Sequence, residues 1–484
     1  MPLDAEAEIE VRTGARPGET QSGLLVLVAQ QADRFQFFET LTNGLQVPMK
    51  VYRYTARHKI QTLVASVLVG CRHIAEVQTK LVPDTAAAGL FGLPRFPDQS
   101  QLNEFLRALG PDQVRQLAAA HQRLLERHSR AGERTAWAVL PTGARVLPVD
   151  LDQTYLATRG TQAQRAARGY FGRKRSAFGY HKSVAYVGGG IKEILFTALE
   201  PGNTHAQEAV PPILTRLAAL AQARGFALDA VLVRGDSQYG SVGVVRQLQA
   251  SRVHYLVKGY GTQTTRHLVD TLPASTVWQD RGTDSYGSHC WVAEGGVQEL
   301  HAHDDRAATP ALRTRVVLLA RVSWRTRRKR GHGAPGKVRE KVVSHEHYLT
   351  DLPTDVLSAD GVIDWYNGRE TEESFFRAEQ DSFGAQYLRT RHFYGQAAFL
   401  WLLASTVNVL RWVQHTQFAG TPLEEAGLTK LVTQALRIPA TVTQLSEHLW
   451  TVTFPATARL IRQLVAAWVT HQWQLPLPLV ENST

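Results

Sequence analysis

Cysteine is nearly absent from this chain, and so is any long hydrophobic run. The 484 residues include only Cys71 and Cys290, which are far apart and outside any CxxC motif. This excludes a disulfide framework and a cysteine-based zinc site, and it fits a reducing compartment. The first twenty residues contain no apolar run, so we expect no signal peptide. The most apolar stretch, 396–410, is too short and too polar to span a bilayer, which predicts a cytoplasmic protein without a membrane partner.

Acidic residues are also in deficit. The chain has 54 Lys and Arg against 43 Asp and Glu, a formal net charge of +11. A basic chain favours polyanionic partners, because each phosphate that is neutralised releases condensed counterions. The hydrophobic content of 44% is ordinary for a folded protein, and the length predicts several domains. Charge alone therefore favours a nucleic-acid partner without establishing one.

Changes in composition and in the spacing of apolar residues divide the chain into six regions. Residues 1–22 are polar and contain Gly and Pro, which predicts a disordered tail. Residues 23–136 have apolar residues at three- and four-residue spacing, which predicts a helical domain. Its basic and aromatic start at 51–58 suits contact with DNA, with an ordinary helix-entry loop as the alternative. The other regions are the first part of an α/β core at 137–260, a strand-rich insertion at 261–355, the second part of the core at 356–415 and a helical C-terminal region at 416–484.

The order of elements in the core predicts its fold. A buried strand at 145–152 is followed by two strands within 182–199, which are joined by a glycine turn. A helix at 207–224 and a strand at 229–236 follow, and then a helix at 242–250 and a strand at 254–258. Three strands, a helix, a strand, a helix and a strand form the order of an RNase H-like mixed sheet.

Two aspartates lie where apolar strands of this sheet are expected to end. Asp152 closes the first strand and Asp236 closes the strand at 229–236. Carboxylates held rigidly on neighbouring strands offer the hard oxygen ligands that magnesium prefers. Either residue alone could equally be a turn or helix-cap aspartate. Asp150 is a second candidate at the first site, because alternation places it on the same face as Asp152.

A third group of polar residues follows in the second part of the core. Tyr366, Arg369 and Glu373 lie at offsets of three and seven residues, which fall on one stripe of a helix. Polar groups that converge in this way favour a functional site, although an ordinary surface ion pair remains the alternative. Glu370 and Glu372 compete for the acidic role, but they do not share the stripe.

These segments together resemble the DDE transposases of bacterial insertion sequences, specifically the IS4 superfamily and its IS1380-like branch. The signature of that superfamily is Tyr, two residues, Arg, three residues, Glu, six residues and Lys. Tyr366, Arg369 and Glu373 match it at the required spacing, whereas Gln380 stands in place of the lysine. Arg377 and Arg389 are candidates to replace the missing cation.

The aspartate segments resemble the same family. Asp152-Gln-Thr154 matches an Asp-x-Thr motif, and Arg234-Gly-Asp236-Ser-Gln-Tyr239 matches an Arg-x-Asp-Ser-x-aromatic block. The segment 199–205 resembles the stretch that follows the third strand in IS1380-like proteins. Because threonine follows the ligand by two residues in the motif, the resemblance favours Asp152 over Asp150. It covers roughly residues 145–410.

The resemblance implies a cut-and-paste transposase that binds transposon ends, cleaves DNA and catalyses strand transfer. Asp152, Asp236 and Glu373 would hold two Mg²⁺ ions, with Mn²⁺ as a substitute, for in-line displacement at phosphorus. The implied partners are double-stranded DNA, both the terminal inverted repeats and the target, and a second copy of the chain in a homodimer. The alternatives are a metal-dependent nuclease without strand transfer and an inactive DNA-binding descendant of a transposase.

Further residues are candidates for contact with DNA. The resemblance implies that Arg369 contacts a phosphate near the transposon end and that Tyr366 contacts a neighbouring phosphate or base. Two segments, 159–182 and 324–330, mix cations with aromatic residues, which suits phosphate contact together with base stacking, although solvated loops or a core tryptophan are the simpler alternatives. The candidates in these segments are Arg173, Lys174, Arg175, Lys182, Trp324, Arg325, Arg327, Arg328, Lys329 and Arg330.

Overall fold

The structure, a computed structural model, divides the chain into two compact units. It describes residues 18–50, 53–158, 162–169, 177–301, 311–328, 337–369, 382–444 and 450–470. The first unit comprises Met1–Ala108, Ala378–Arg389 and Trp412–Thr484, and the second comprises Leu109–Arg377 and Thr390–Arg411. Most of the tail expected to be disordered, residues 1–17, lies outside the described residues.

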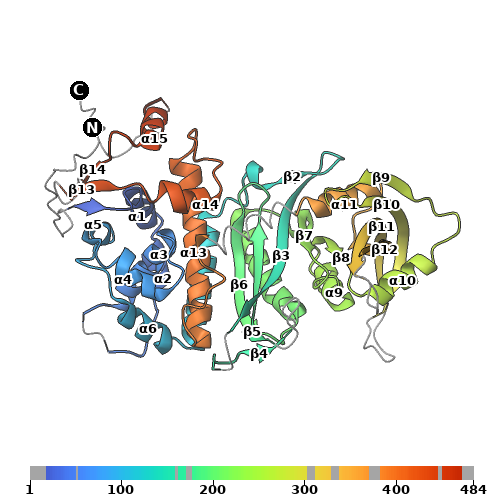
Figure 1. Cartoon of the computed structure of the whole chain (residues 1–484), viewed down its shortest axis with the longest axis horizontal. Coiled ribbons are helices and arrows are strands. Elements are labelled where there is room, and N and C mark those ends of the chain that lie inside the picture. The colour runs from blue at the N-terminus through green and yellow to red at the C-terminus, as the bar shows by residue number, and fades with distance from the viewer. Residues whose placement is uncertain are drawn as a thin grey trace. The chain divides into compact units, whose positions relative to one another are not determined.

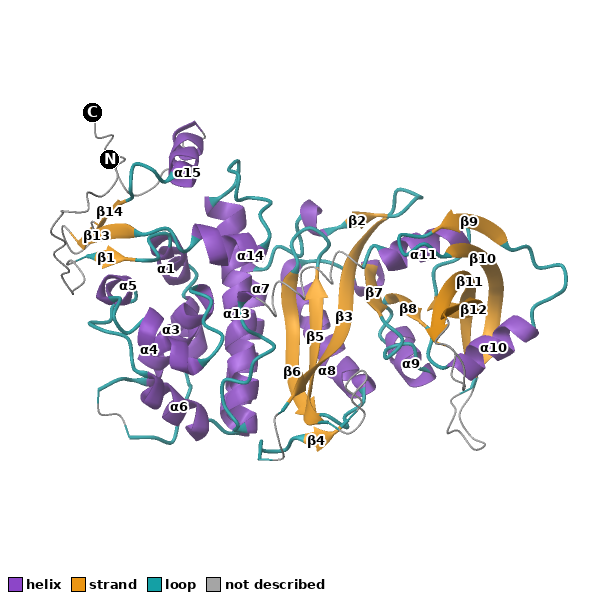
Figure 2. Cartoon of the chain, in the orientation of Figure 1, coloured by secondary structure: helices purple, strands orange, loops and turns teal. Residues whose placement is uncertain are grey.

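The N-terminal part of the first unit is helical, as Figure 2 shows. Its helices are α1 (Leu25–Arg34), α2 (Phe37–Thr42), α3 (Ala56–Leu68), α4 (Val77–Lys80), α5 (Thr85–Leu90) and α6 (Gln99–Ala108), with a 3₁₀ turn, η1 (Ile74–Glu76), between α3 and α4. Helix α3 begins at Thr55, whose hydroxyl accepts a hydrogen bond from the backbone N–H of His58. Nearly all of α3 is buried, so it forms the centre of this unit.

The C-terminal part of the first unit contains strands that the sequence analysis did not predict. Its elements are α14 (Leu428–Lys430), the π-helical turn η5 (Leu431–Ala435), β13 (Ala440–Gln444), β14 (Trp450–Thr453) and α15 (Arg459–Thr470). Strand β13 pairs with β14 and also with β1 (Glu19–Thr20) from the other end of the chain. The region 416–484 is therefore not wholly helical, because the β-branched run at 440–444 finds strand partners on both sides.

The second unit is built on one large mixed sheet (Figure 1). Along the sheet the order is β4-β5-β3-β7-β8-β12-β11-β10-β9, with β6 beside β5 and β2 beside β3. The strands are β2 (Ala138–Val139), β3 (Arg145–Ala157), β4 (Ala167–Arg168), β5 (Phe178–Val187), β6 (Glu193–Pro201), β7 (Val231–Gly235), β8 (His254–Lys258), β9 (Gln279–Thr283), β10 (His289–Leu300), β11 (Leu312–Arg328) and β12 (Lys337–Thr350).

Five of these strands confirm the predicted RNase H-like core. Strands β3, β5 and β6 form an antiparallel meander, and β7 and β8 then lie parallel to β3 on its other side. The crossovers are helical: α8 (Val210–Arg224) leads from β6 to β7, and α9 (Val242–Ala250) leads from β7 to β8. The resulting spatial order, β6-β5-β3-β7-β8, places the carboxyl ends of β3, β7 and β8 along one edge region of the sheet.

The strand-rich insertion extends the core sheet. Strand β12 pairs antiparallel with β8, with Leu349 opposite Val257, and β11, β10 and β9 continue the sheet outwards. The insertion also contains a helix, α10 (Thr262–Asp270). The basic stretch at 325–328 belongs to β11 and pairs with β12, whereas the sequence analysis placed it in a loop. Lys329 and Arg330 lie outside the described residues.

Helix α11 (Ala359–Asn367) attaches the second part of the core to this sheet. Val362 and Ile363 of α11 are buried in a cluster with Leu232 of β7, Leu256 of β8 and Val317 of β11. The sheet face under α11 therefore includes both core and insertion strands. This packing fixes where the end of α11 lies relative to β7 and β8.

The remaining long helices cover the meander of the second unit. Helix α7 (Pro111–His128) is held by His121, whose Nε2 lies 2.9 Å from the carbonyl oxygen of Ile194 in β6 and whose Nδ1 lies 2.9 Å from Ser405 Oγ. Ser405 belongs to α13 (Phe393–Gln417). Helix α13 is long and apolar enough to cross a membrane, although the stretch 396–410 was predicted to be too short for this. However, 94% of its most apolar 18-residue stretch is buried inside the protein, as in the core helix of a folded domain.

The two units do not follow the boundaries expected from the sequence. Helix α7 lies in the region expected to belong to an N-terminal helical domain, yet it is part of the second unit. Conversely, residues from Trp412 onwards belong to the first unit together with the N-terminal helices. The pairing of β1 with β13 accounts for this grouping, because it joins the two ends of the chain.

Candidate active site at the ends of β3 and β7

Strands β3 and β7 bring two predicted ligands together. The strands are parallel, with Asp150 opposite Arg234 and Leu151 opposite Gly235, and the pairing stops there. Asp152 directly follows Leu151 and Asp236 directly follows Gly235, so the two aspartates lie beside each other at this edge. Asp236 acts on Asp152 electrostatically and raises its pKa, as expected for neighbouring carboxylates.

The position of Asp152 differs in one respect from the prediction. The sequence analysis placed it at the end of a strand, but β3 continues to Ala157. The continuation pairs with β5 alone, with Asp152 opposite Val184 and Ala157 opposite Gly179. Asp152 therefore marks the end of the parallel pairing with β7 and not the end of its strand.

Burial gives the Asp152 carboxyl an unusual pKa. Its side chain is 19% exposed, and loss of solvent raises its pKa to about 6. The Arg369 guanidinium, with Nη2 3.8 Å from Asp152 Oδ1, opposes this rise, as does Lys182. The carboxylate is therefore incompletely stabilised by its protein neighbours, and a metal cation would favour its charged form.

Asp150, the competing candidate, is fully engaged elsewhere. Its two carboxylate oxygens accept hydrogen bonds from Nε and Nη2 of Arg234, both at 2.7 Å, and both side chains are almost completely buried. The Nη1 of Arg234 donates to the carbonyl oxygen of Trp365 in α11 at 3.0 Å. This pair ties β3, β7 and α11 together, so Asp150 has a structural role as an ion-pair partner.

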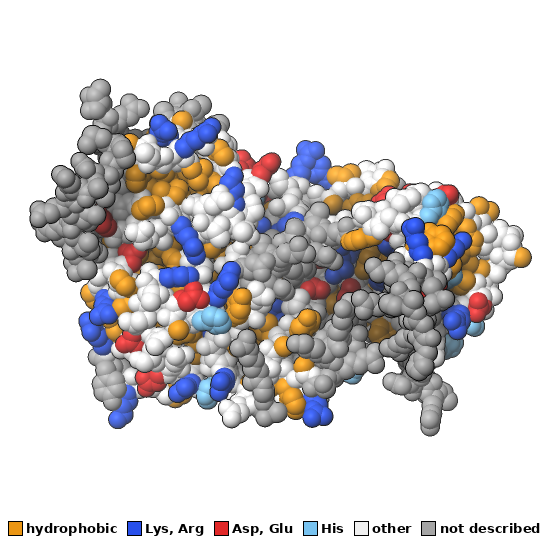
Figure 3. Space-filling view, in the orientation of Figure 1, with side chains coloured by type: hydrophobic (Ala, Val, Ile, Leu, Met, Phe, Trp, Pro, Cys, Tyr) orange, Lys and Arg blue, Asp and Glu red, His pale blue; other side chains and the backbone are white. Residues whose placement is uncertain are grey.

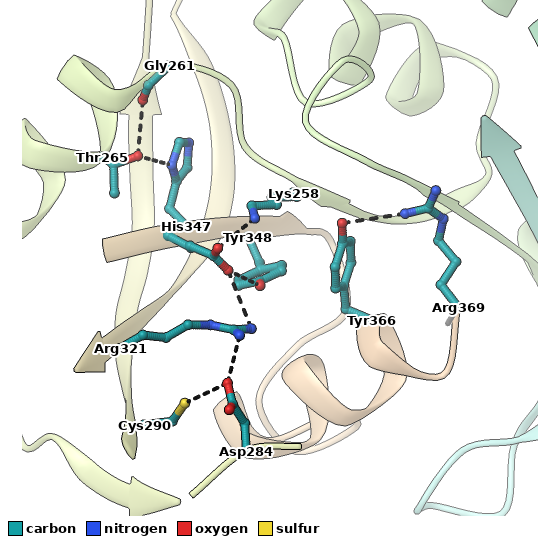
Figure 4. A network of polar contacts seen from close by, with 11 residues as sticks. Lys258, Gly261, Thr265, Asp284, Cys290, Arg321, His347, Tyr348, Tyr366 and Arg369 are labelled. Atoms are coloured by element: carbon teal, nitrogen blue, oxygen red, sulfur yellow. Dashed lines mark hydrogen bonds and ion pairs between the residues drawn. The ribbon is translucent and has the colours of Figure 1, made fainter. Parts of the chain in front are cut away.

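Tyr366 and Arg369 converge on the same edge. The Nη1 of Arg369 donates to the Tyr366 hydroxyl at 3.4 Å (Figure 4). The Nη2 of Arg369 donates to the carbonyl oxygen of Leu151, also at 3.4 Å. Burial raises the pKa of Tyr366 to about 12, so this phenol stays neutral. The two side chains of the predicted stripe therefore meet beside Asp152.

Of the three residues in the predicted stripe, the structure describes Tyr366 and Arg369, and only Tyr366 lies within helix α11. Helix α11 ends at Asn367, and Arg369 lies in the turn that follows, where its N–H donates to the carbonyl oxygen of Tyr366. Asn367 and Gly368 are poor helix formers, which accounts for the end of the helix. Glu373 and Gln380 lie outside the described residues, so the structure does not place the third predicted ligand.

Several buried polar atoms around the two aspartates have no hydrogen-bond partner within the described part of the chain. They are the Tyr239 hydroxyl, the Thr154 hydroxyl and the Nε of Arg369. Tyr239 is fully buried, and its pKa is raised first by burial and then by Asp152 and Asp236. Buried polar groups normally find partners, so this region is suited to an additional polar or ionic occupant.

A polar network connects the site to the insertion strands (Figure 4). The ring of Tyr366 packs edge-on against Tyr348 of β12 with centroids 4.8 Å apart, and the Tyr348 hydroxyl donates to Glu346. Glu346 also accepts a hydrogen bond from Lys258 Nζ at 2.7 Å. Lys258 follows Val257, the partner of Gly235, so it lies next to Asp236 along the sheet edge. The sequence analysis missed Lys258, although it closes the next apolar strand after Asp236.

The predicted DNA contacts outside this centre have different surroundings. Lys182 lies on β5 and is 1% exposed, so it faces the interior near Asp152 rather than the surface. Trp324 is 56% exposed, and the Arg339 guanidinium lies over its ring at 5.1 Å. Arg325, Arg327 and Arg328 lie on β11, and the structure describes only their backbone; Arg173, Lys174 and Arg175 lie outside the described residues. Lys and Arg side chains are spread widely over the face in Figure 3.

One proposed replacement for the missing lysine has a structural role. Arg389 is 4% exposed within the first unit and donates hydrogen bonds to the carbonyl oxygens of Cys71 and Phe383. These contacts hold the guanidinium inside that unit. Arg377, the other candidate, lies outside the described residues.

The family model described as transposase DDE domain group 1 matches residues 3–466, almost the whole chain. The chain belongs to this family. This confirms the resemblance to DDE transposases that the short sequence motifs indicated.

Other comparisons add little to this family assignment. No curated protein matches the sequence. Among solved structures, a chain of the Mos1 transposase paired-end complex with left transposon end is similar at 13% identity and a TM-score of 0.16. The match covers 47% of this chain and 66% of the Mos1 chain, so the present chain spans just under two thirds of that protein's length.

Proposed function

We propose that this protein is a DNA transposase that binds transposon ends, cuts DNA and joins the ends to a target by cut-and-paste transposition. Its family supports this proposal. The observation that carries it is that Asp152 and Asp236 lie together at one edge of the sheet. The Nη2 of Arg369 lies 3.8 Å from Oδ1 of Asp152. Acidic ligands next to a phosphate-binding cation suit phosphoryl transfer on DNA.

The residues at this edge fit divalent metal ions. Two neighbouring carboxylates share one nearby guanidinium, and burial raises the pKa of Asp152 to about 6, so added positive charge would stabilise the pair. Among the described residues no group of three His, Cys, Asp or Glu side chains is close enough to hold a metal. We assign the third ligand to Glu373, so that Asp152, Asp236 and Glu373 would together hold two Mg²⁺ ions. Mn²⁺ is the expected substitute.

The protein's own residues would then orient the DNA. Bound metal ions would activate the attacking oxygen and stabilise the leaving oxygen of an in-line displacement. Arg369, held by Tyr366 and the carbonyl of Leu151, would present its guanidinium to a phosphate next to the scissile bond. The Asp150–Arg234 pair would keep α11 and its end in register with the sheet. The proposed partners are the terminal inverted repeats, the target DNA and a second copy of the chain.

A cleavage and joining assay tests this function. The substrate is a duplex that carries the inverted repeat found beside the gene, with Mg²⁺ and a supercoiled target, and gel analysis separates nicked, cut and joined products. We expect joined product from the wild type and none from Asp152→Ala, Asp236→Ala or Glu373→Ala, with DNA binding preserved. Asp355→Asn is the matched control, because Asp355 is an exposed carboxylate of the same unit.

Each result of this assay has a distinct meaning. Cutting without joining would replace the proposal with a metal-dependent nuclease. Binding without cutting would indicate an inactive descendant that retains only DNA binding. Cutting that survives in all three alanine variants would remove these carboxylates from the mechanism.

A further inference from the structure

The first unit contains a cavity that is unrelated to the carboxylate site. Its volume is about 490 Å³, and it lies between the end of α3, the η1–α4 segment, residues 382–387 and η5. Every residue that lines it belongs to the first unit. A cavity of this size is large enough for a small ligand or for one unit of a polymer.

The lining of this cavity is strongly basic. Arg72, Lys80 and Arg437 line it, against the single carboxylate of Glu76. That carboxylate is already engaged, because it accepts a hydrogen bond from Lys80 Nζ at 2.5 Å and others from the backbone N–H groups of Arg72 and His73 at 3.0 and 3.1 Å. Lys80 therefore balances Glu76, and the charges of the two arginines remain in excess.

Local backbone geometry holds the Arg437 guanidinium at the cavity wall. Its Nη2 donates to the carbonyl oxygen of Val69 at 3.1 Å. Gly70 next to Val69 has a φ of +64°, and a Cβ at this position would lie 3.0 Å from the same Nη2. Gly70 thus permits both the left-handed turn and the close approach of the guanidinium.

The cavity lining also includes an aromatic side chain, Tyr387. The Arg72 guanidinium lies 5.9 Å from the ring centre of Tyr387, and the His73 ring packs edge-on against Tyr387 with centroids 4.9 Å apart. Arg72 is exposed, so its charge is accessible from solvent. The cavity thus combines two guanidinium groups, a phenol and an imidazole. These groups bind phosphate oxygens and pack against nucleoside rings.

We propose that this cavity is a phosphate-binding site, with Arg72 and Arg437 as the anion ligands and Tyr387 beside the attached nucleoside. Guanidinium groups favour phosphate because their N–H donors match its oxygens in pairs. The phosphate belongs either to a nucleic-acid strand or to a free nucleotide. The proposal is independent of Asp152 and Asp236, and it can be tested without metal or cleavage.

The test measures binding of two probes to the full-length protein in EDTA. One probe is a fluorescein-labelled 20-base-pair duplex followed by anisotropy over a range of salt concentrations, and the other is deoxyadenosine 5′-monophosphate followed by calorimetry. Arg72→Glu is compared with Arg107→Glu, the same charge change at an exposed position of α6 in the same unit. Thermal unfolding verifies that both variants fold.

We expect Arg72→Glu to reduce the affinity of the protein for one of the two probes by about tenfold. Arg107→Glu should leave both affinities unchanged. If the affinity for the duplex falls and the slope of log affinity against log salt concentration decreases by about one, the site holds a backbone phosphate. If the mononucleotide binds to the wild type and is lost in Arg72→Glu, the site holds a free nucleotide. Equal affinities of the two variants for both probes would overturn the proposal. Arg437→Lys, which retains the charge but not the paired donors, should weaken the same probe as Arg72→Glu.

Discussion

Asp150 and Asp152 are two residues apart on β3, yet their surroundings are opposite. Asp150 has both oxygens bonded by Arg234 at 2.7 Å, deep inside the second unit. Asp152 has Arg369 at 3.8 Å, Asp236 as a neighbour of like charge and a pKa raised by burial to about 6. Within the described residues, Asp150 is satisfied by a bidentate ion pair and Asp152 has the Arg369 guanidinium only at the longer distance of 3.8 Å, which is the basis for proposing Asp152 as the metal ligand.

The difference lies in the two arginines. Arg234 is fixed by a bidentate pair and by the carbonyl of Trp365, so it stabilises the fold. Among the described residues Arg369 makes only long contacts, and its Nε has no hydrogen-bond partner there. The proposed metal ligand and its structural neighbour therefore differ in how completely the arginine beside each is engaged. Sequence motifs alone do not carry this information.

The largest expected effect is on catalysis. Asp152→Asn should reduce DNA cleavage by at least about 1000-fold, because it removes a negatively charged metal ligand. Asp355→Asn should cleave at the wild-type rate. Single-turnover cleavage of a labelled repeat-end duplex in saturating Mg²⁺ measures both. Cleavage by Asp152→Asn within tenfold of the wild type would place the ligand elsewhere on β3.

The next effect is on stability. Asp150→Ala should lower the free energy of unfolding by about 3 to 5 kcal/mol, because the buried Arg234 charge loses its partner. The double variant Asp150→Ala/Arg234→Met should recover much of this loss, since it removes the unpaired charge. Urea unfolding followed by circular dichroism measures both variants. A loss of less than about 1 kcal/mol for Asp150→Ala would show that the pair does not hold the fold.

A smaller effect of opposite sign is expected at Asp152. The raised pKa means that the ionised carboxylate destabilises the metal-free fold, so Asp152→Asn should be more stable than the wild type by roughly 3 kcal/mol at pH 8 in EDTA. The folded protein binds this proton more tightly than the unfolded chain. The wild type should therefore gain stability relative to Asp152→Asn as the pH falls through about 6 towards 4. Unfolding curves from pH 4 to 8 test this, and a pH-independent difference would contradict it.

The smallest effect is expected at Tyr366. Tyr366→Phe removes the hydroxyl that accepts the 3.4 Å hydrogen bond from Arg369 but keeps the ring against Tyr348. Cleavage should fall about three- to tenfold with little change in the unfolding free energy, since a long hydrogen bond contributes about 1 kcal/mol or less. Arg369→Lys should lose more activity than Tyr366→Phe, because the paired donors are lost. The reverse order would assign the phosphate contact to the tyrosine.

The core of the fold could be predicted because its signals are local. The apolar strand up to Asp152, the glycine turn after Val187 and the helix that begins near Val210 are all readable from short stretches of sequence. Long-range pairing could not be predicted in this way. The joining of β12 to β8 and of β1 to β13 depends on strands far apart in the chain, and their edges carry no distinctive residue type.

The candidate site was predictable in part for the same reason. The proximity of Asp152 to Asp236 follows from two parallel strands whose pairing ends one residue earlier, and the contact between Tyr366 and Arg369 follows from their three-residue spacing. Which of Asp150 and Asp152 is satisfied by the protein depends on Arg234, which lies on another strand. Lys258 was missed because its partner, Glu346, lies on β12 in the insertion.

The most direct test of the central claim is a measurement of metal binding. Electron paramagnetic resonance of free Mn²⁺, titrated with protein, compares the wild type with Asp152→Asn and with Asp355→Asn as the exposed control. We predict that the wild type and Asp355→Asn bind Mn²⁺ alike and that Asp152→Asn loses at least about tenfold in affinity, because a carboxylate ligand is gone. Unchanged Mn²⁺ binding by folded Asp152→Asn would contradict the assignment of the metal site to this edge of the sheet.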